Sequence, residues 1–356
     1  MEHAAGLRWS RVALCAIGAL WLSIAALAEP PAPPAELSTA SSLAELARAR
    51  TESLARANAA VVGVQAEAVE DARSIDTLGR RRQGSGVVIG ADGLVLTIGY
   101  LILEADHVDL VIGSSRRVPA RVVAYDIASG FGLLQALAPI DVLPVALGHS
   151  STLSDDEPLM IASGGGDGEL SLARMVSRRA FSGYWEYHID GALFTAPPRT
   201  DHSGAALFNA DGELLGIGSL VVGDVLGPGQ PRMPGNMFVP VDLLKPILPE
   251  LRERGASRSS RRAWLGLNCV EVDGQVRVLR VMADGPAEDA GLQPGDQIVA
   301  IDDAAVSGLE SLYKTLWRGD AAERDVALQV RRNGSLRPVT VHARDRMTTM
   351  RSAQGT

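Results

Sequence analysis

Residues 84–97 read GSGVVIGADGLVLT, two short apolar runs separated by a glycine-containing turn. Both runs consist mainly of Val, Leu and Ile, which is the composition of buried β-strands. Similar runs recur as far as residue 247, separated by Gly, Pro, Asp and Ser, and they include VDLVIG, ARVVAYD, LMIASG and NMFVPV. Many short strands at close spacing predict an all-β barrel or sandwich.

The composition of the whole chain is that of a globular protein. The 356 residues are 46% hydrophobic and 21% charged, and this length favours two domains. A net charge of −8 gives no reason to expect nucleic acid as a partner. Of the two cysteines, Cys15 lies in the N-terminal apolar segment, so Cys269 would have no internal partner for a disulfide after export.

The N-terminus has the pattern of an export signal. Arg8 and Arg11 precede an apolar run over residues 12–27, and a small-residue cleavage motif ends at Ala28. We expect residues 1–28 to be removed after Ala28, leaving no stable membrane span. The alternative is an uncleaved membrane anchor.

The remaining boundaries follow from changes in composition. We expect a linker and helix over 29–57, with helical spacing in 41–57, and an exposed polar loop over 71–83. Residues 164–198 are interpreted as a long irregular loop and residues 248–262 as a solvated linker. A second unit over 263–346 contains a helical stretch near 309–317 and a strand pair with an Asn333-Gly334 turn. Residues 347–356 are expected to be a disordered tail.

Several blocks of sequence carry a family likeness. The segments GSGVVIGADGLVLT, RVVAYDIASGFGLLQA and TDHSGAALFNADGELLGIGS resemble the HtrA/DegP family of exported trypsin-like serine proteases, and WLGL with GPAEDAGLQPGDQIVAIDD resembles the PDZ domain that follows the protease. The likeness runs from residue 57 to residue 342. It implies a mostly β fold in the periplasm: a trypsin-like pair of six-stranded barrels over 58–247 with a site between them, then a PDZ domain.

The resemblance also places the catalytic triad, and two of its three members are replaced. Tyr100 falls where the family has histidine, Gly130 falls where it has aspartate, and Ser203 keeps the nucleophile position. A serine hydroxyl is a weak nucleophile without an adjacent base. A tyrosine is neutral at physiological pH, and glycine has no side chain that could orient a base.

The oxyanion loop differs as well. Asp201 stands where the family has glycine, next to His202, and its carboxylate is expected to oppose developing negative charge. Five other candidates for the base are expected to be surface or capping residues: His202, His107, Asp126, His149 and His188. Ser203 itself has two interpretations, a residue that fills a tight turn and a residue with residual chemistry.

The PDZ-like unit keeps the elements of a peptide site. Trp264, Leu265, Gly266 and Leu267 match the loop that binds a terminal carboxylate through backbone N–H groups, and Asn268 begins the strand that would pair with a peptide. Leu312 and Leu316 would lie on one wall, and the alternative for both is ordinary core. Cys269 is interpreted as a small buried hydrophobe.

These features lead to one main hypothesis and one rival. The main hypothesis is an exported HtrA-like pseudoprotease that binds unfolded or C-terminal hydrophobic peptides as a chaperone, adaptor or regulator of envelope protein quality control. The rival is a weakly active serine endopeptidase that uses Ser203 with a noncognate base. No metal or other cofactor is expected. An active HtrA-type protease is one expected partner. The resemblance implies trimers formed through the N-terminal region, but residues 36–57 contain no aromatic residue, which argues against a homotrimer. Homo- and hetero-oligomers both stay open.

Overall fold

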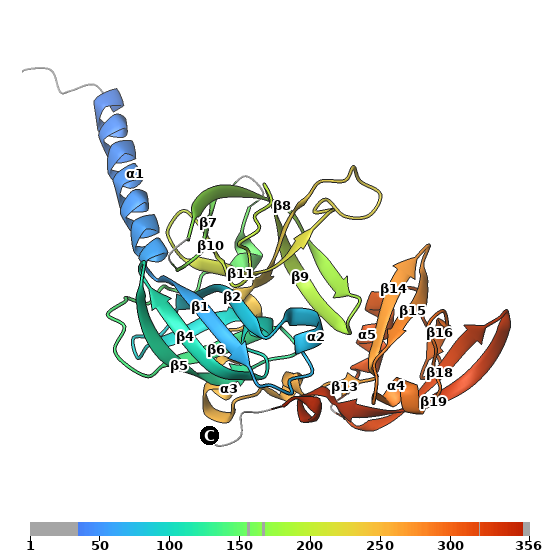
Figure 1. Cartoon of the computed structure of the whole chain (residues 1–356). Coiled ribbons are helices and arrows are strands. Elements are labelled where there is room, and N and C mark those ends of the chain that lie inside the picture. Colours follow the sequence, from blue (N-terminus) through green and yellow to red (C-terminus); the bar gives the residue numbers. More distant parts are fainter. Residues whose placement is uncertain (1–34, 155–156, 166–167, 320, 352–356) are drawn as a thin grey trace, which may run out of the picture. The chain divides into compact units, whose positions relative to one another are not determined.

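The structure is a computed structural model that describes residues 35–154, 157–165, 168–319 and 321–351 (Figure 1). The chain forms two compact units, Met1–Glu45 and Leu46–Thr356. Helix α1 (Ala35–Ala59) includes the predicted helix over 41–57 and begins in the first unit. None of the described helices is long and apolar enough to cross a bilayer. The expected signal segment, residues 1–28, lies outside the described residues.

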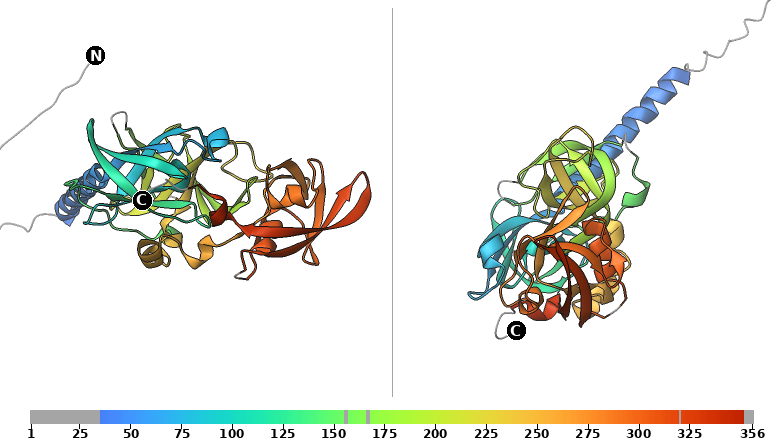
Figure 2. Two further views of the ribbon diagram at one scale, coloured as in Figure 1. Left: turned by 60° about the horizontal axis from the view of Figure 1, so that its bottom comes forward. Right: turned by 90° about the vertical axis from the view of Figure 1, so that its right-hand side faces the viewer.

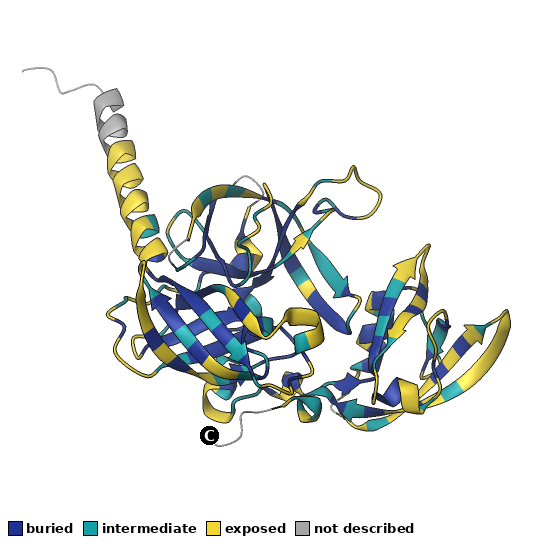
Figure 3. Ribbon diagram, viewed as in Figure 1, coloured by how far each residue is buried: buried dark blue, intermediate teal, exposed yellow. Residues whose placement is uncertain are grey.

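Residues 61–136 form a closed six-stranded barrel. The short apolar runs predicted a barrel or a sandwich, and the family resemblance implied this barrel. All its neighbouring strands are antiparallel, and inward-facing residues such as Leu96, Leu110 and Leu133 are completely buried (Figure 3). In order around the barrel the strands are β1 (Val61–Ala68), β2 (Arg81–Val88), β3 (Leu94–Ile98), β6 (Phe131–Ala136), β5 (Arg116–Tyr125) and β4 (Ala105–Ile112).

A second closed barrel follows, and it corrects the expectation of an irregular loop over 164–198. Most of that segment is one long hairpin made of β8 and β9, which Figure 2 shows from two further sides. In order around the barrel the strands are β10 (Ala206–Phe208), β11 (Leu214–Val222), β12 (Gly235–Pro240), β9 (Tyr187–Ala196), β8 (Leu170–Gly183) and β7 (Leu159–Ala162).

Two segments expected to be solvated are ordered against the first barrel. In the expected exposed loop 71–83, a short helix α2 (Ile75–Leu78) forms, and Arg82 is buried with its guanidinium on the carbonyls of Tyr100 and Leu103. The expected linker 248–262 contains helix α3 (Leu248–Arg254), which buries Leu251, and a 3-10 turn at Arg258–Ser260. Backbone and side-chain hydrogen bonds order these segments although their composition is polar.

The C-terminal domain is a sheet with two helices and its own hydrophobic core. The sheet order is β13 (Ala263–Trp264), β19 (Ser335–Asp345), β18 (Arg324–Arg332), β16 (Gln297–Ile301), β15 (Gln275–Val281) and β14 (Leu267–Val272), with β17 (Ala304–Ala305) beside β16. The helices are α4 (Pro286–Asp289) and α5 (Leu309–Leu316), close to the predicted 309–317.

The C-terminal segment corrects another expectation. Residues Arg346–Thr349 form a 3-10 turn rather than a disordered tail, and the backbone N–H of Arg351 donates to Glu104 at 2.8 Å. Glu104 also accepts hydrogen bonds from Ser74, so the end of the described chain is attached to the first barrel. Residues 352–356 lie outside the described residues.

Candidate functional site

Ser203 lies in a tight turn that enters β10. Gly204 adopts φ +74°, and a Cβ there would come within 2.0 Å of the carbonyl oxygen of Ser85 on β2. The N–H of Ser85 in turn donates to the carbonyl of Ser203 at 2.8 Å. Only glycine fits such a close approach. The turn therefore fixes Ser203 against the first barrel, with the serine side chain half-buried.

Tyr100 occupies the position beside Ser203, on a 3-10 turn (Gly99–Leu101) that directly follows β3. Its hydroxyl lies 2.8 Å from Ser203 Oγ and 2.9 Å from the carbonyl oxygen of Ser219. Burial raises the pKa of Tyr100 to about 12, and the hydrogen bond with Ser203 offsets this only in part. The phenol is neutral at physiological pH, so it contacts the serine without being able to act as its general base.

The position of the missing aspartate is occupied by another tyrosine. Gly130 adopts φ +81°, and a Cβ added to it would lie 2.8 Å from the hydroxyl oxygen of Tyr187. That hydroxyl donates to the carbonyl of Ser129 at 2.8 Å, and burial raises the pKa of Tyr187. Tyr187 was not among the predicted site residues. Its only signal in the sequence is the aromatic cluster FSGYWEYH.

Asp126, the carboxylate nearest in sequence to Gly130, is fully engaged elsewhere. It is completely buried and accepts hydrogen bonds from the backbone and hydroxyl of Ser129 and from the hydroxyls of Ser257 and Ser260. It acts as the expected capping residue, holding its own turn and the segment after α3 together. Four hydrogen bonds leave it no role as a substitute for the triad aspartate.

The negative charge of Asp201 is balanced by Arg199, which corrects the expectation that this charge opposes an oxyanion. Its carboxylate contacts the guanidinium of Arg199 at 2.9 Å and 2.5 Å and the hydroxyl of Ser163 at 2.5 Å. Burial disfavours its ionised form, but these partners outweigh burial and hold the pKa of Asp201 below its ordinary value.

The histidines do not supply a base to Ser203. His202 Nδ1 lies 3.0 Å from the carbonyl of Thr200, and burial lowers the pKa of His202. His107 on β4 and His149 before the turn at Ser150–Thr152 are exposed, as expected. His188 contradicts its expected place on a surface loop, because it is buried on β9. In the described part of the chain, no hydrogen bond is recorded between any of them and Ser203.

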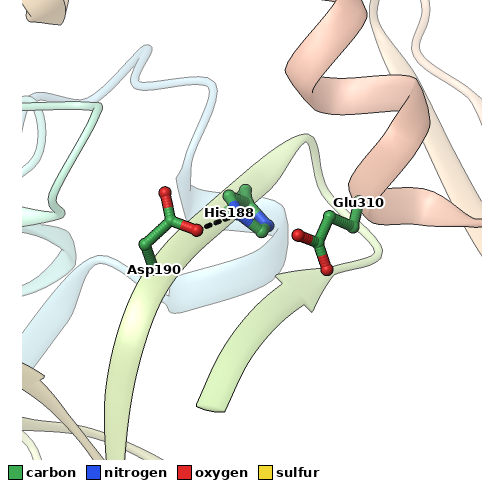
Figure 4. A group of neighbouring side chains, drawn as sticks. All are labelled: His188, Asp190 and Glu310. Atoms are coloured by element: carbon green, nitrogen blue, oxygen red, sulfur yellow. Dashed lines mark hydrogen bonds and ion pairs between the residues drawn. The ribbon is translucent and has the colours of Figure 1, made fainter.

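His188 belongs to a small polar cluster with Asp190 and Glu310 (Figure 4). His188 Nδ1 lies 2.8 Å from the hydroxyl of Ser182, and Nε2 lies 3.2 Å from Asp190. These three side chains have the composition of a metal site. The ammonium of Lys314, however, lies 3.0 Å from Asp190 and 2.7 Å from Glu310, so a protein cation already provides the positive charge between the carboxylates.

The predicted carboxylate-binding loop forms, and a side chain of the same protein occupies it. Gly266 adopts φ +80°, which lets the N–H groups of Leu265 and Leu267 converge. Both donate to the carboxylate of Glu186, at 3.0 Å and 2.8 Å. Trp264 is buried on β13 and pairs with Arg344 of β19. Glu186 was not predicted as a site residue.

The strand and helix beside this loop contact the same segment. The N–H of Cys269 on β14 donates to the carbonyl of Tyr184 at 2.8 Å, and the hydroxyl of Tyr313 on α5 donates to the carbonyl of Gly183 at 2.8 Å. Cys269 is buried, and burial raises the pKa of its thiol, consistent with the predicted role of a buried hydrophobe.

The three remaining predicted groove residues separate into two groups. Leu312 and Leu316 are both 1% exposed and belong to the core cluster of the domain, so the core alternative describes their position. Asn268 pairs through its backbone with Arg280 of β15. Its side chain is only half-buried.

Comparison with known proteins identifies both domains of the chain. Residues 84–217 match the family model of the trypsin-like peptidase domain, and residues 263–342 match that of the PDZ domain. A probable periplasmic serine endoprotease DegP-like from Hahella chejuensis is 28% identical over 278 residues, covering 69% of this chain and 56% of that protein. Serine protease PepD of Mycobacterium tuberculosis is 27% identical and covers 74% and 61%. The chain spans little more than half the length of these relatives.

Solved structures show the same fold. HtrA-type protease AlgW with decapeptide matches with a TM-score of 0.52 and 21% identity, over 83% of this chain and 98% of that one. The serine endoprotease from Yersinia pestis matches with a TM-score of 0.52 and 20% identity, over 83% and 97%.

Proposed function

This chain carries a trypsin-like peptidase domain followed by a PDZ domain and is a homologue of the DegP/HtrA endoproteases, and from that premise we propose that it binds polypeptide chains without cleaving them. The observation that carries the proposal is the contact of the Tyr100 hydroxyl with Ser203 Oγ at 2.8 Å. The nucleophile is present, but the group beside it cannot remove its proton at physiological pH.

Two changes act in the same direction. Tyr100 is a neutral phenol, and Tyr187 fills the space in front of Gly130. In subtilisin, removing the serine or the histidine alone lowers turnover by about 10⁶-fold, and the remainder depends on the oxyanion hole and substrate binding. A site without a base or an orienting carboxylate is expected to lose a comparable amount.

The binding activity is assigned to the PDZ domain. Its loop at Gly266 presents convergent N–H groups, and β14 offers an edge to an extended chain, the two elements that capture a C-terminal peptide. The solved AlgW structure with a decapeptide supports peptides as the ligand class. We expect unfolded chains or hydrophobic C-termini as ligands, in a chaperone, adaptor or regulatory role in envelope protein quality control.

The periplasm is the proposed location, because several of the relatives are named as periplasmic endoproteases. Cleavage after Ala28 is part of this proposal, with an uncleaved inner-membrane anchor as the alternative. An active HtrA-type protease and other copies of this chain are proposed as possible partners.

A fluorophosphonate probe tests the absence of cleavage chemistry, because it modifies activated serines. We expect no labelling of the wild-type protein above that of the Ser203→Ala variant. Stoichiometric labelling of Ser203 would favour the second candidate, a weakly active endopeptidase. The retained and only half-buried serine at position 203 is the observation that supports this second candidate.

A further inference from the structure

The tip of the β8–β9 hairpin lies along the groove of the PDZ domain. The contacts run in order along the segment: Gly183 to the hydroxyl of Tyr313, Tyr184 to the N–H of Cys269, and Glu186 to the carboxylate-binding loop. A peptide that adds to a sheet edge uses the same pattern, with main-chain hydrogen bonds to the strand and a terminal carboxylate in the loop.

We propose that residues 183–186 are an internal ligand of the PDZ groove, in which the Glu186 side chain takes the place of a peptide's C-terminal carboxylate. This inference rests on the proposed peptide-binding function. The groove of the full chain is closed to other ligands while the hairpin is docked. A hydrophobic C-terminal peptide must displace Glu186, because both use the N–H groups of Leu265 and Leu267.

The conformation of the hairpin tip fits it for this position. Glu186 adopts φ +55°, a left-handed conformation that is uncommon for a residue other than glycine, and it is only 4% exposed. Trp185 stacks on Tyr187 with ring centroids 5.6 Å apart and an interplanar angle of 12°. Arg346 donates to the carbonyl of Trp185 at 3.2 Å. An uncommon conformation of this kind persists where the surrounding contacts require it.

A second set of contacts attaches the start of β9, next to the hairpin tip, to the wall of the groove. Lys314 on α5 binds both Asp190 of β9 and Glu310 of its own helix. The hydroxyl of Tyr313 binds the tip from the same helix. Helix α5, which would flank a bound peptide, thus contacts the hairpin through both Tyr313 and Lys314.

The test uses the full chain and two readouts. Hydrogen exchange measured by mass spectrometry over residues 264–270 reports whether the hairpin protects the groove. Fluorescence anisotropy measures binding of a fluorescein-labelled decapeptide ending in Leu-Val-Val, with its C-terminal amide as the probe that lacks the carboxylate. The variants are Glu186→Ala and Glu186→Gln, and Glu253→Gln on exposed helix α3 is the matched carboxylate control. Tyr313→Phe removes the second hydrogen bond while keeping the ring.

We expect Glu186→Ala to lower protection of the groove amides by about tenfold and to tighten binding of the decapeptide by about tenfold, because a partly occupied site reduces apparent affinity by the open fraction. Glu186→Gln and Tyr313→Phe should act in the same direction with smaller effects. Glu253→Gln should change neither readout, and the amidated peptide should bind weakly to all variants.

The two readouts separate the possible failures. Equal protection and equal affinity in wild type and Glu186→Ala, with the decapeptide bound, would overturn the internal ligand and leave the peptide-binding function standing. Reduced protection in Glu186→Ala without any peptide binding would overturn the proposed function and, with it, the competition. If Glu186→Ala unfolds, the isosteric Glu186→Gln and Tyr313→Phe variants decide the same question.

Discussion

Docking of Glu186 in the PDZ loop should depend on pH. Burial raises the pKa of Glu186 from an ordinary value of 4.5 to about 7, against the opposing effect of the N–H groups of Leu267 and Leu265. Between pH 4.5 and 7 the docked state therefore binds more protons than the open state. Docking is strongest below pH 4.5 and weakens as the pH rises to about 7.

The size of the effect follows from the same shift. Between pH 5 and pH 7 the two pKa values change the ratio of docked to open molecules by about 40-fold, or about 2 kcal/mol. The affinity of the wild-type chain for the labelled decapeptide should therefore tighten by up to about 40-fold between pH 5 and pH 7. The ligand's own terminal carboxylate is ionised throughout this range.

The assay is fluorescence anisotropy from pH 5 to pH 8 with wild type and Glu186→Gln. Three other groups face Glu186: the guanidinium of Arg346, the phenol of Tyr313 and the thiol of Cys269, and burial raises the pKa of the last two. The glutamine variant removes the carboxyl of Glu186 and leaves every other titratable group in place, so it isolates the contribution of Glu186. A pH dependence of equal size in Glu186→Gln would refute the reasoning.

Two further predictions concern the barrels. The double substitution Tyr100→His with Gly130→Asp should not produce casein hydrolysis, because the new side chain at position 130 meets the hydroxyl of Tyr187. Activity should require Tyr187→Gly as a third change. Casein hydrolysis by the double variant would contradict this account of the site. Gly204→Ala should destabilise the protein by about 3 kcal/mol or more in urea unfolding, since it combines a positive φ with a 2.0 Å approach to a backbone carbonyl. The control Gly229→Ala, with φ +75° and open space around it, should cost only about 1 kcal/mol. Equal losses of stability in the two variants would show that the backbone moves to remove the close contact at Gly204.

Much of the fold could be predicted because each barrel strand has a local signature. The apolar runs and their turn residues lie within a few positions of each other, so each strand can be recognised locally. The motif around Ser203 fixes the position of the serine in the sequence of strands. The same motifs predicted that Tyr100 faces Ser203, and the hydroxyl of Tyr100 lies 2.8 Å from the serine Oγ.

The β8–β9 hairpin could not be predicted from local sequence signatures. Strand β8 consists mostly of exposed and half-buried residues and contains Arg174, Arg178 and Arg179, so it lacks the apolar run that identifies a strand. Its two functional contacts join residues far apart in sequence: Tyr187 with Ser129, and Glu186 with Leu265. No local pattern encodes such pairs.

The Asp201 error was avoidable. Arg199 stands two residues before Asp201, and two residues separated in this way can place their side chains on the same side of an extended segment. The basic neighbour could have indicated that the carboxylate is neutralised.

The central claim is that this protein binds chains without cutting them, and the most direct measurement is casein hydrolysis by the purified wild-type protein beside its Ser203→Ala variant. An active DegP-type protease serves as the positive control. The account predicts no difference between wild type and Ser203→Ala, at any pH from 6 to 9. Cleavage by the wild type that disappears in Ser203→Ala would contradict it.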